Sequence, residues 1–110
     1  MRQLVIDELS REEWHNLESY LKRNLKPGPL PGLFWLELPP ELWGAAQQGH
    51  EECAPFYLGV ELTEKRLVFE LLVRSSGRLH CSCIGYAEPA QRDFLLHFFD
   101  KMLAEERIRA

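Results

Sequence analysis

No stretch of the sequence approaches the roughly 20 consecutive apolar residues of a membrane-spanning helix, and the chain has no internal repeat or low-complexity tract. Its start also lacks the long apolar region of a secretory signal. Basic residues are scarce, with 13 Lys and Arg against 17 Asp and Glu. Because phosphate binding relies on a basic excess, we expect no nucleic-acid partner, and no anionic membrane partner for the same reason.

Cysteine is also scarce. There are three cysteines, at positions 53, 81 and 83, and an odd number excludes a framework in which every cysteine is paired. Free thiols persist in reducing compartments. The sequence therefore predicts a cytoplasmic protein with free cysteines.

What is present suits one folded domain over residues 1–110. Hydrophobic residues make up 45% of the chain and charged residues 27%, both ordinary for a globular protein. A chain of 110 residues has room for one core and no second domain.

Two helices are predicted, one near each end. Ser10 followed three residues later by Glu13 forms a capping-box pattern, and the helix that follows is ended by the prolines of "KPGPLPG". Pro89, just after Glu88, marks the start of the second helix. Residues 39–50 suggest a further short helix, weakened by a glycine.

The segments 33–38 and 56–86 alternate with period two, which is typical of strands. A turn at residues 64–65 would place Val60 opposite Phe69 and Leu58 opposite Leu71. A third strand would carry Leu79, Cys81 and Cys83 on the same apolar face. The predicted fold is α+β: a mainly antiparallel sheet, made of this three-stranded meander plus strand 33–38, with both helices packed on one face. Whether residues 2–6 join the sheet is left open.

The order helix, strands, helix resembles that of small bacterial α+β adaptor and secretion-chaperone folds. The resemblance is one of topology alone and carries over no motif or residue.

The C-terminal helix is apolar around about 200° of its circumference, twice the arc of an ordinary surface helix. One sheet face cannot cover all of it, so either other elements of the chain or a second chain must cover the rest, and large apolar patches usually mark partner surfaces. We therefore predict self-association or a protein partner, with Leu96, Phe99 and Leu103 as interface candidates.

The cysteines allow two interpretations. His50 with Cys53, and Cys81 with Cys83, could form the halves of a divided zinc site, but in a strand Cys81 and Cys83 would point into the core, where free cysteine packs as a small hydrophobe. The same burial disfavours a reactive redox pair. The sequence thus favours core packing, with no metal and no cofactor, and zinc or redox chemistry as the less favoured alternative.

A third set of candidates lies on the polar face of the sheet and in the aromatic, proline-rich region before it. Tyr57, Glu70 and His80 could form a shallow binding or catalytic surface beneath Trp35 or Trp43. Alternation alone also places polar residues on a solvated face. The leading function is therefore a non-enzymatic protein–protein interaction module, and the alternative is a small-molecule-binding or catalytic domain.

Overall fold

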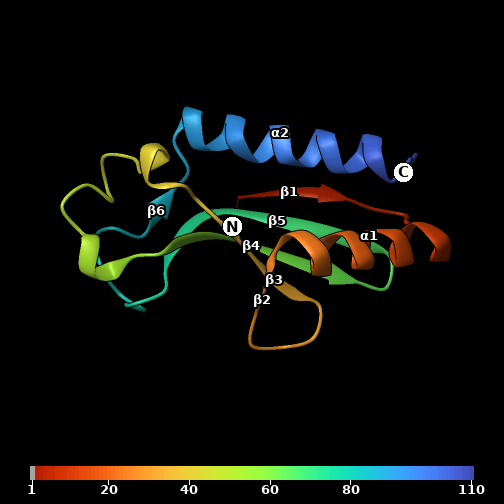
Figure 1. Cartoon of the computed structure of the whole chain (residues 1–110), viewed down its shortest axis with the longest axis horizontal. Helices are drawn as coiled ribbons and strands as arrows, with labels where there is room; N and C mark the ends of the chain where they lie inside the picture. The colour runs from red at the N-terminus through yellow and green to blue at the C-terminus, as the bar shows by residue number, and fades with distance from the viewer. Residues whose placement is uncertain (1) are drawn as a thin grey trace.

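The computed structural model describes residues 2–110 and has an α+β fold. A six-stranded antiparallel sheet runs in the order β1-β5-β4-β3-β2, and β6 pairs with β5 beyond the end of β1. The strands are β1 (Gln3–Ile6), β2 (Lys26–Pro27), β3 (Leu33–Glu37), β4 (Phe56–Thr63), β5 (Arg66–Ser75) and β6 (Gly85–Tyr86). Figure 1 shows α2 running along the sheet and α1 beside it.

Both predicted helices are confirmed, with their caps. Helix α1 (Arg11–Asn24) begins after Ser10, whose hydroxyl accepts the Glu13 N–H while the Glu13 carboxylate accepts the Ser10 N–H. Helix α2 (Pro89–Glu105) begins after Glu88 with the same reciprocal pattern, completed by Gln91. The helix suggested over residues 39–50 is wrong: only the 3-10 turn η1 (Pro40–Leu42) forms there.

The two helices cover one face of the sheet. The ring of Phe69 on β5 packs edge-on against Phe98 and Phe99 of α2, and Phe98 packs against Tyr20 of α1. The buried core also takes residues from β1, β3, β4, β5 and both helices: Ile6, Leu17, Leu21, Phe34, Leu36, Leu58, Val60, Leu62, Leu67, Val73, Leu95 and Met102. Within residues 2–110 no helix lies on the opposite face of the sheet (Figure 1).

The β4–β5 hairpin has the predicted register near its turn, with Leu62 opposite Leu67 and Val60 opposite Phe69. The predicted pairing of Leu58 with Leu71 is wrong, because a bulge between Leu58 and Val60 shifts Leu58 to face Val73. Residues of β5 between Phe69 and Val73 therefore lie across from Gly59 alone, and β5 bends there.

The third strand of the meander forms, but it is confined to Gly85–Tyr86, which pair with Leu72–Val73. The predicted strand pairing of Leu79 and Cys81 with β5 is wrong, since residues 76–84 form bends and turns. Residues 3–6, whose place was open, form the edge strand β1 against β5.

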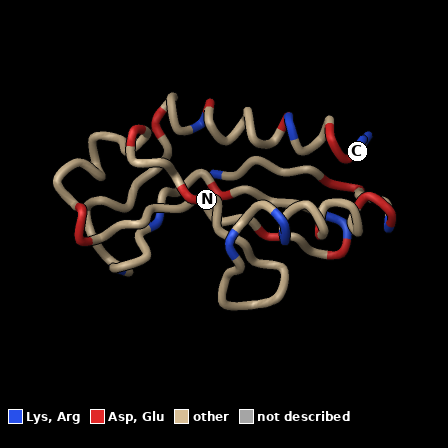
Figure 2. Tube along the Cα trace, in the orientation of Figure 1, with Lys and Arg blue, Asp and Glu red and all other residues tan. Residues whose placement is uncertain are grey.

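No helix within residues 2–110 is long and apolar enough to cross a membrane. Lys and Arg lie scattered among Asp and Glu along the chain (Figure 2). This distribution gives the molecule no extended basic stripe in that view.

Candidate metal centre and open sheet face

His50, Cys53, Cys81 and Cys83 meet at one end of the molecule. The first two come from the connection before β4 and the last two from the connection after β5, and these connections lie together in Figure 1. Burial classes differ within the set: Cys53 and Cys83 are buried, whereas His50 and Cys81 are half-buried. The centre is therefore shielded on its inner side and open to solvent on its outer side.

Local structure sets the spacing within each half. His50 and Cys53 lie on one turn of 3-10 helix η2 (Glu51–Cys53), closed by the Cys53 N–H donating to the His50 carbonyl at 2.9 Å. Cys81 begins a tight turn, closed by the Ile84 N–H donating to the Cys81 carbonyl at 3.1 Å. In a strand the two cysteines would point the same way about 6–7 Å apart. The turn instead brings the thiols of Cys81 and Cys83 within 4.8 Å of each other and of the other half.

The distances fit a tetrahedral ion. Zinc holds sulfur at about 2.3 Å and imidazole nitrogen at about 2.0–2.1 Å, so the donors of a tetrahedral site lie roughly 3.5–3.8 Å apart. Here the Sγ atoms of Cys53 and Cys81 are 4.0 Å apart, and Nδ1 of His50 is 3.5 Å from Cys81 Sγ. All four donor atoms lie within 4.8 Å of one another. The three thiols and the imidazole therefore match the Cys₃His set of structural zinc sites.

This arrangement corrects the interpretation of the cysteines as strand residues of the core. Cys83 and Cys53 are indeed buried, but Cys81 is half-buried and its thiol is hydrogen-bonded to the His50 imidazole. The signal was present in the sequence as H-x2-C and C-x-C, two short-spaced halves separated by the β4–β5 hairpin. Sequence alone could not show that the hairpin returns the second half to the first.

Hydrogen bonds hold the two halves together. The Ser75 hydroxyl and the Gly77 N–H, the latter at 3.3 Å, both donate to the Cys53 carbonyl. A Cβ at Gly77 would lie 3.0 Å from the Glu52 carbonyl oxygen, so glycine permits this close approach of the two backbones. The Cys53 turn and the start of the Cys81 segment are thereby fixed beside each other.

The buried side-chain amides of Gln47 and Gln91 hold the Cys83 turn on the core side of the centre. Gln47 donates from Nε2 to the Cys83 carbonyl at 2.7 Å, and its Oε1 accepts from Gln91 Nε2 at 3.0 Å and from the Gly44 N–H at 2.8 Å. Gln47 and Gln91 are the two polar residues in the buried set, exposed by 2% and 1%. They connect the Cys83 turn to the first turn of α2.

The thiols differ in acidity. The Cys83 N–H, and then the Cys83 thiol, donate to Cys81 and lower its pKa to about 7, with smaller contributions from Cys53 and the charge of His50. Burial, with the neighbouring thiols, raises the pKa of Cys83 to about 12. Metals bind thiolates, so coordination at this centre requires Cys83 to lose a proton.

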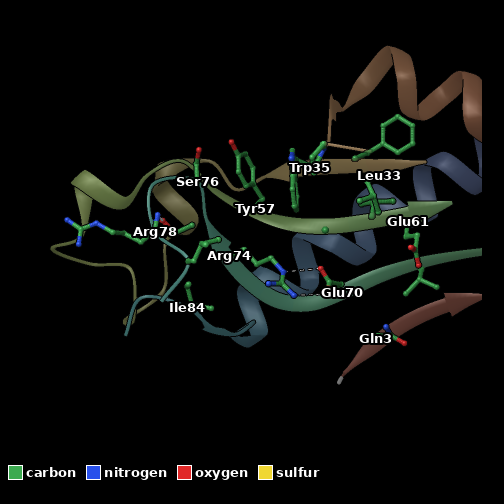
Figure 3. Close-up of a pocket in the computed structure, with 17 residues that line it drawn as sticks. Gln3, Leu33, Trp35, Tyr57, Glu61, Glu70, Arg74, Ser76, Arg78 and Ile84 are labelled. Atoms are coloured by element: carbon green, nitrogen blue, oxygen red, sulfur yellow. Dashed lines mark hydrogen bonds and ion pairs between the residues drawn. The ribbon is translucent and has the colours of Figure 1, made fainter. Parts of the chain in front are cut away.

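The open face of the sheet carries a hollow of about 560 Å³. Its floor holds Trp35 of β3 and Tyr57 of β4, whose rings stack at 5.2 Å with 21° between their planes. Figure 3 shows these rings side by side on the face away from α2. Pro29 borders the hollow on one side. At the end near the cysteines it is bordered by Ser75, Ser76, Arg78, Leu79 and Ile84.

An ion pair crosses the floor of the hollow. Arg74 donates from Nε and Nη2 to the two carboxylate oxygens of Glu70 at 3.1 and 3.0 Å. Glu70 raises the pKa of Arg74, because the carboxylate accepts its N–H bonds. A Cβ at Gly59 would lie 2.3 Å from Oε1 of Glu70, so the Glu70 carboxylate occupies the space that a side chain on β4 would fill.

The predicted binding residues divide into two groups. Trp35, Tyr57 and Glu70 lie together in the hollow. His80 is exposed in the segment after β5 and is not among the residues that line the hollow in the described chain. Trp43 packs edge-on against Phe56 at 5.0 Å, on the core side.

The predicted interface residues on α2 are less exposed than a free helix face would be. Phe99 and Leu103 are half-buried against the core, and Phe99 contacts Phe69. Leu96 is 43% exposed. Much of the apolar arc of α2 is thus covered within the chain itself.

Compared with known family models, curated proteins and solved structures, this chain has no match.

Proposed function

We propose that this chain is a zinc-binding module in which His50, Cys53, Cys81 and Cys83 hold one structural Zn²⁺. The proposal depends on one observation: four donor atoms of the types zinc prefers, from two distant segments, lie within 4.8 Å of one another. Cysteine and histidine donors in a roughly tetrahedral set favour zinc over magnesium or calcium, which take oxygen donors.

The role of the ion is structural under this proposal. Four protein donors fill a tetrahedral zinc ion and leave no position for a reactive water, which catalytic zinc sites keep. The module then acts by binding another protein and not by catalysis. A cytoplasmic location, where thiols stay reduced, agrees with such a site.

Zinc would stabilise most the segment that has the fewest hydrogen bonds and buried side chains of its own. Between the end of β5 and β6, residues 76–84 make few backbone hydrogen bonds and contribute one fully buried side chain, Cys83. Small domains often use a metal to fix segments that their core cannot. Here the ion would tie this segment to the η2 turn before β4.

Metal analysis of the untagged protein, purified without chelator or added metal, tests the proposal. We expect close to one zinc per chain, and thiols that react with a thiol reagent only after chelation or unfolding. The His50→Ala variant should lose most of the metal. His80→Ala is the matched control, because His80 is exposed and directly precedes Cys81, the cysteine that His50 contacts. This variant should keep its zinc.

Replacement of zinc by Co²⁺ gives an optical test of the donor set. Three thiolates and one imidazole should produce sulfur-to-cobalt charge-transfer bands and the strong visible bands of tetrahedral cobalt. Protein that retains no metal, with thiols that react in the folded state or a Cys53–Cys81 disulfide found by mass spectrometry, would contradict the proposal.

A further inference from the structure

The open sheet face carries both a hollow and a projecting apolar side chain. Leu79 is 88% exposed, the highest value among the large exposed apolar residues Val5, Leu30, Leu79, Tyr86 and Leu96. It lies at the border of the hollow whose floor holds Trp35 and Tyr57. Trp and Tyr are enriched at the centres of protein–protein interfaces, and a contiguous apolar patch around them is typical of an interaction surface.

The hollow has opposite charges at its two ends and a neutral ion pair on its floor. On the floor, Glu70 and Arg74 neutralise each other. Arg78 lies at the end near the cysteines. Glu61 of β4 lies at the far end, where it is opposite Leu33 of β3 and Val68 of β5. Figure 3 shows Arg78 and Glu61 at opposite ends of the hollow.

A surface with opposite charges at its two ends is complementary to a reversed copy of itself. In a two-fold dimer the same patch is used by both chains. If the axis lies in the interface and runs across the hollow, the Arg78 end of one chain meets the Glu61 end of the other. The same operation carries Leu79 of each chain to the Leu33 and Val68 end of its partner's hollow.

We propose that the open sheet face binds a second copy of this chain in a two-fold dimer. Leu79 of each protomer enters the hollow of the other, and Arg78 of each protomer pairs with Glu61 of the other. The inference rests on the proposed zinc site in one respect, because the ion would fix the segment that carries Leu79, two residues before Cys81.

Sedimentation velocity on the zinc-loaded full chain, over a range of concentrations, tests the proposal. We expect a species of twice the 12.9 kDa chain mass. Leu79→Asp should raise the dimer dissociation constant by about tenfold or more, because it places a charge in an apolar pocket. The matched control is Leu96→Asp, on α2 at the other face, which should leave the constant unchanged.

Charge reversal tests the orientation of the two chains. Arg78→Glu alone and Glu61→Arg alone should each weaken the dimer by bringing like charges together. The double variant should recover most of the loss, because the pair is then restored with its signs exchanged. A double variant no better than the single ones would overturn the two-fold arrangement.

Metal content measured on each sample separates this inference from the zinc proposal. A zinc-bound chain that stays monomeric at all concentrations overturns the dimer and leaves the metal site standing. A dimer that contains no metal overturns the zinc proposal and leaves the dimer standing. A dimer broken by Leu96→Asp and not by Leu79→Asp places the interface on α2 and overturns the inference, as does a monomer whose hollow takes up a small molecule or an unrelated peptide.

If Leu79→Asp loses its zinc, the segment itself has been disturbed, and the two charge-reversal variants then decide the outcome. Their side chains lie at the ends of the hollow and are exposed. Neither is a metal donor, so their zinc content should match that of the unmodified chain.

Discussion

Gln47 donates a hydrogen bond of 2.7 Å from its side-chain amide to the carbonyl oxygen of Cys83, and both residues are buried. We expect Gln47→Leu to lower the free energy of unfolding by about 2–3 kcal/mol, because the Cys83 carbonyl and the Gly44 N–H lose their partner inside the protein. Denaturant titration of the zinc-loaded chain measures this change. Zinc affinity should fall as well, since the Cys83 turn is no longer held.

The matched control is Gln48→Leu. Gln48 is exposed and donates to the Trp43 carbonyl at 3.0 Å, outside the buried pair. Its replacement should change stability by less than about 1 kcal/mol and leave zinc affinity unaltered. Equal effects at positions 47 and 48 would show that the hydrogen bond to Cys83 does not support the centre.

Removal of zinc should loosen one end of the molecule and spare the other. With chelator present, we expect faster amide hydrogen exchange in residues 50–54 and 76–84, because the ion no longer joins these segments. The hairpin ladder near Leu62 and Leu67 lies at the far end of β4 and β5 and should stay protected. Hydrogen exchange with and without chelator, followed by mass spectrometry, measures the difference. Uniform loss of protection along the whole chain would contradict a local role.

Local patterns predicted the helices and the hairpin because their causes lie within a few residues. Ser10 and Glu13 form the capping box within one turn of the chain, and the period-two pattern on both sides of residues 64–65 fixes which side chains face the core. Trp35, Tyr57 and Glu70 were also placed on one face by alternation, and the hollow contains all three.

The bulge and the candidate metal centre both depend on distant contacts, which explains why sequence reasoning did not predict the bulge and disfavoured the zinc interpretation of the cysteines. The bulge allows the Glu70 carboxylate to lie over Gly59, and no property of either residue alone indicates that contact. Leu79, Cys81 and Cys83 alternate as they would in a buried strand, and burial of cysteine is expected in a core and in a zinc site alike. Only the position of His50 and Cys53 distinguishes the two.

Gly59→Ala should be destabilising only while Glu70 is present. The new methyl group would displace the Glu70 carboxylate and break its two bonds with Arg74, at a cost of about 1 kcal/mol. In a Glu70→Ala background the same change should cost little. Unfolding free energies of the two single variants and the double variant measure this coupling. Additive effects would mean that the displaced carboxylate is not the cause.

The capping box of α1 should make stability depend on acid. N–H groups of Ser10 and then of Arg109 donate to the Glu13 carboxylate and lower its pKa from 4.5. A carboxyl whose pKa is lower in the folded state stabilises the fold above its unfolded pKa, and the contribution disappears as the pH falls through the folded value. Glu13→Gln, which keeps an acceptor at the same position, should therefore lose stability less steeply between about pH 5 and pH 3 than the unmodified chain.

Ser10→Ala removes the other half of the capping box and should lower the free energy of unfolding at neutral pH by about 1 kcal/mol. Thermal unfolding at a series of pH values measures both variants. The control is Glu12→Gln, in the same exposed first turn of α1, which should follow the acid dependence of the unmodified chain. If Glu13→Gln also follows that dependence, the low pKa of Glu13 does not contribute to folding. The acid sensitivity must then come from other carboxylates. One of these is Asp7, whose pKa is lowered by the N–H of Glu8 and then by Arg66.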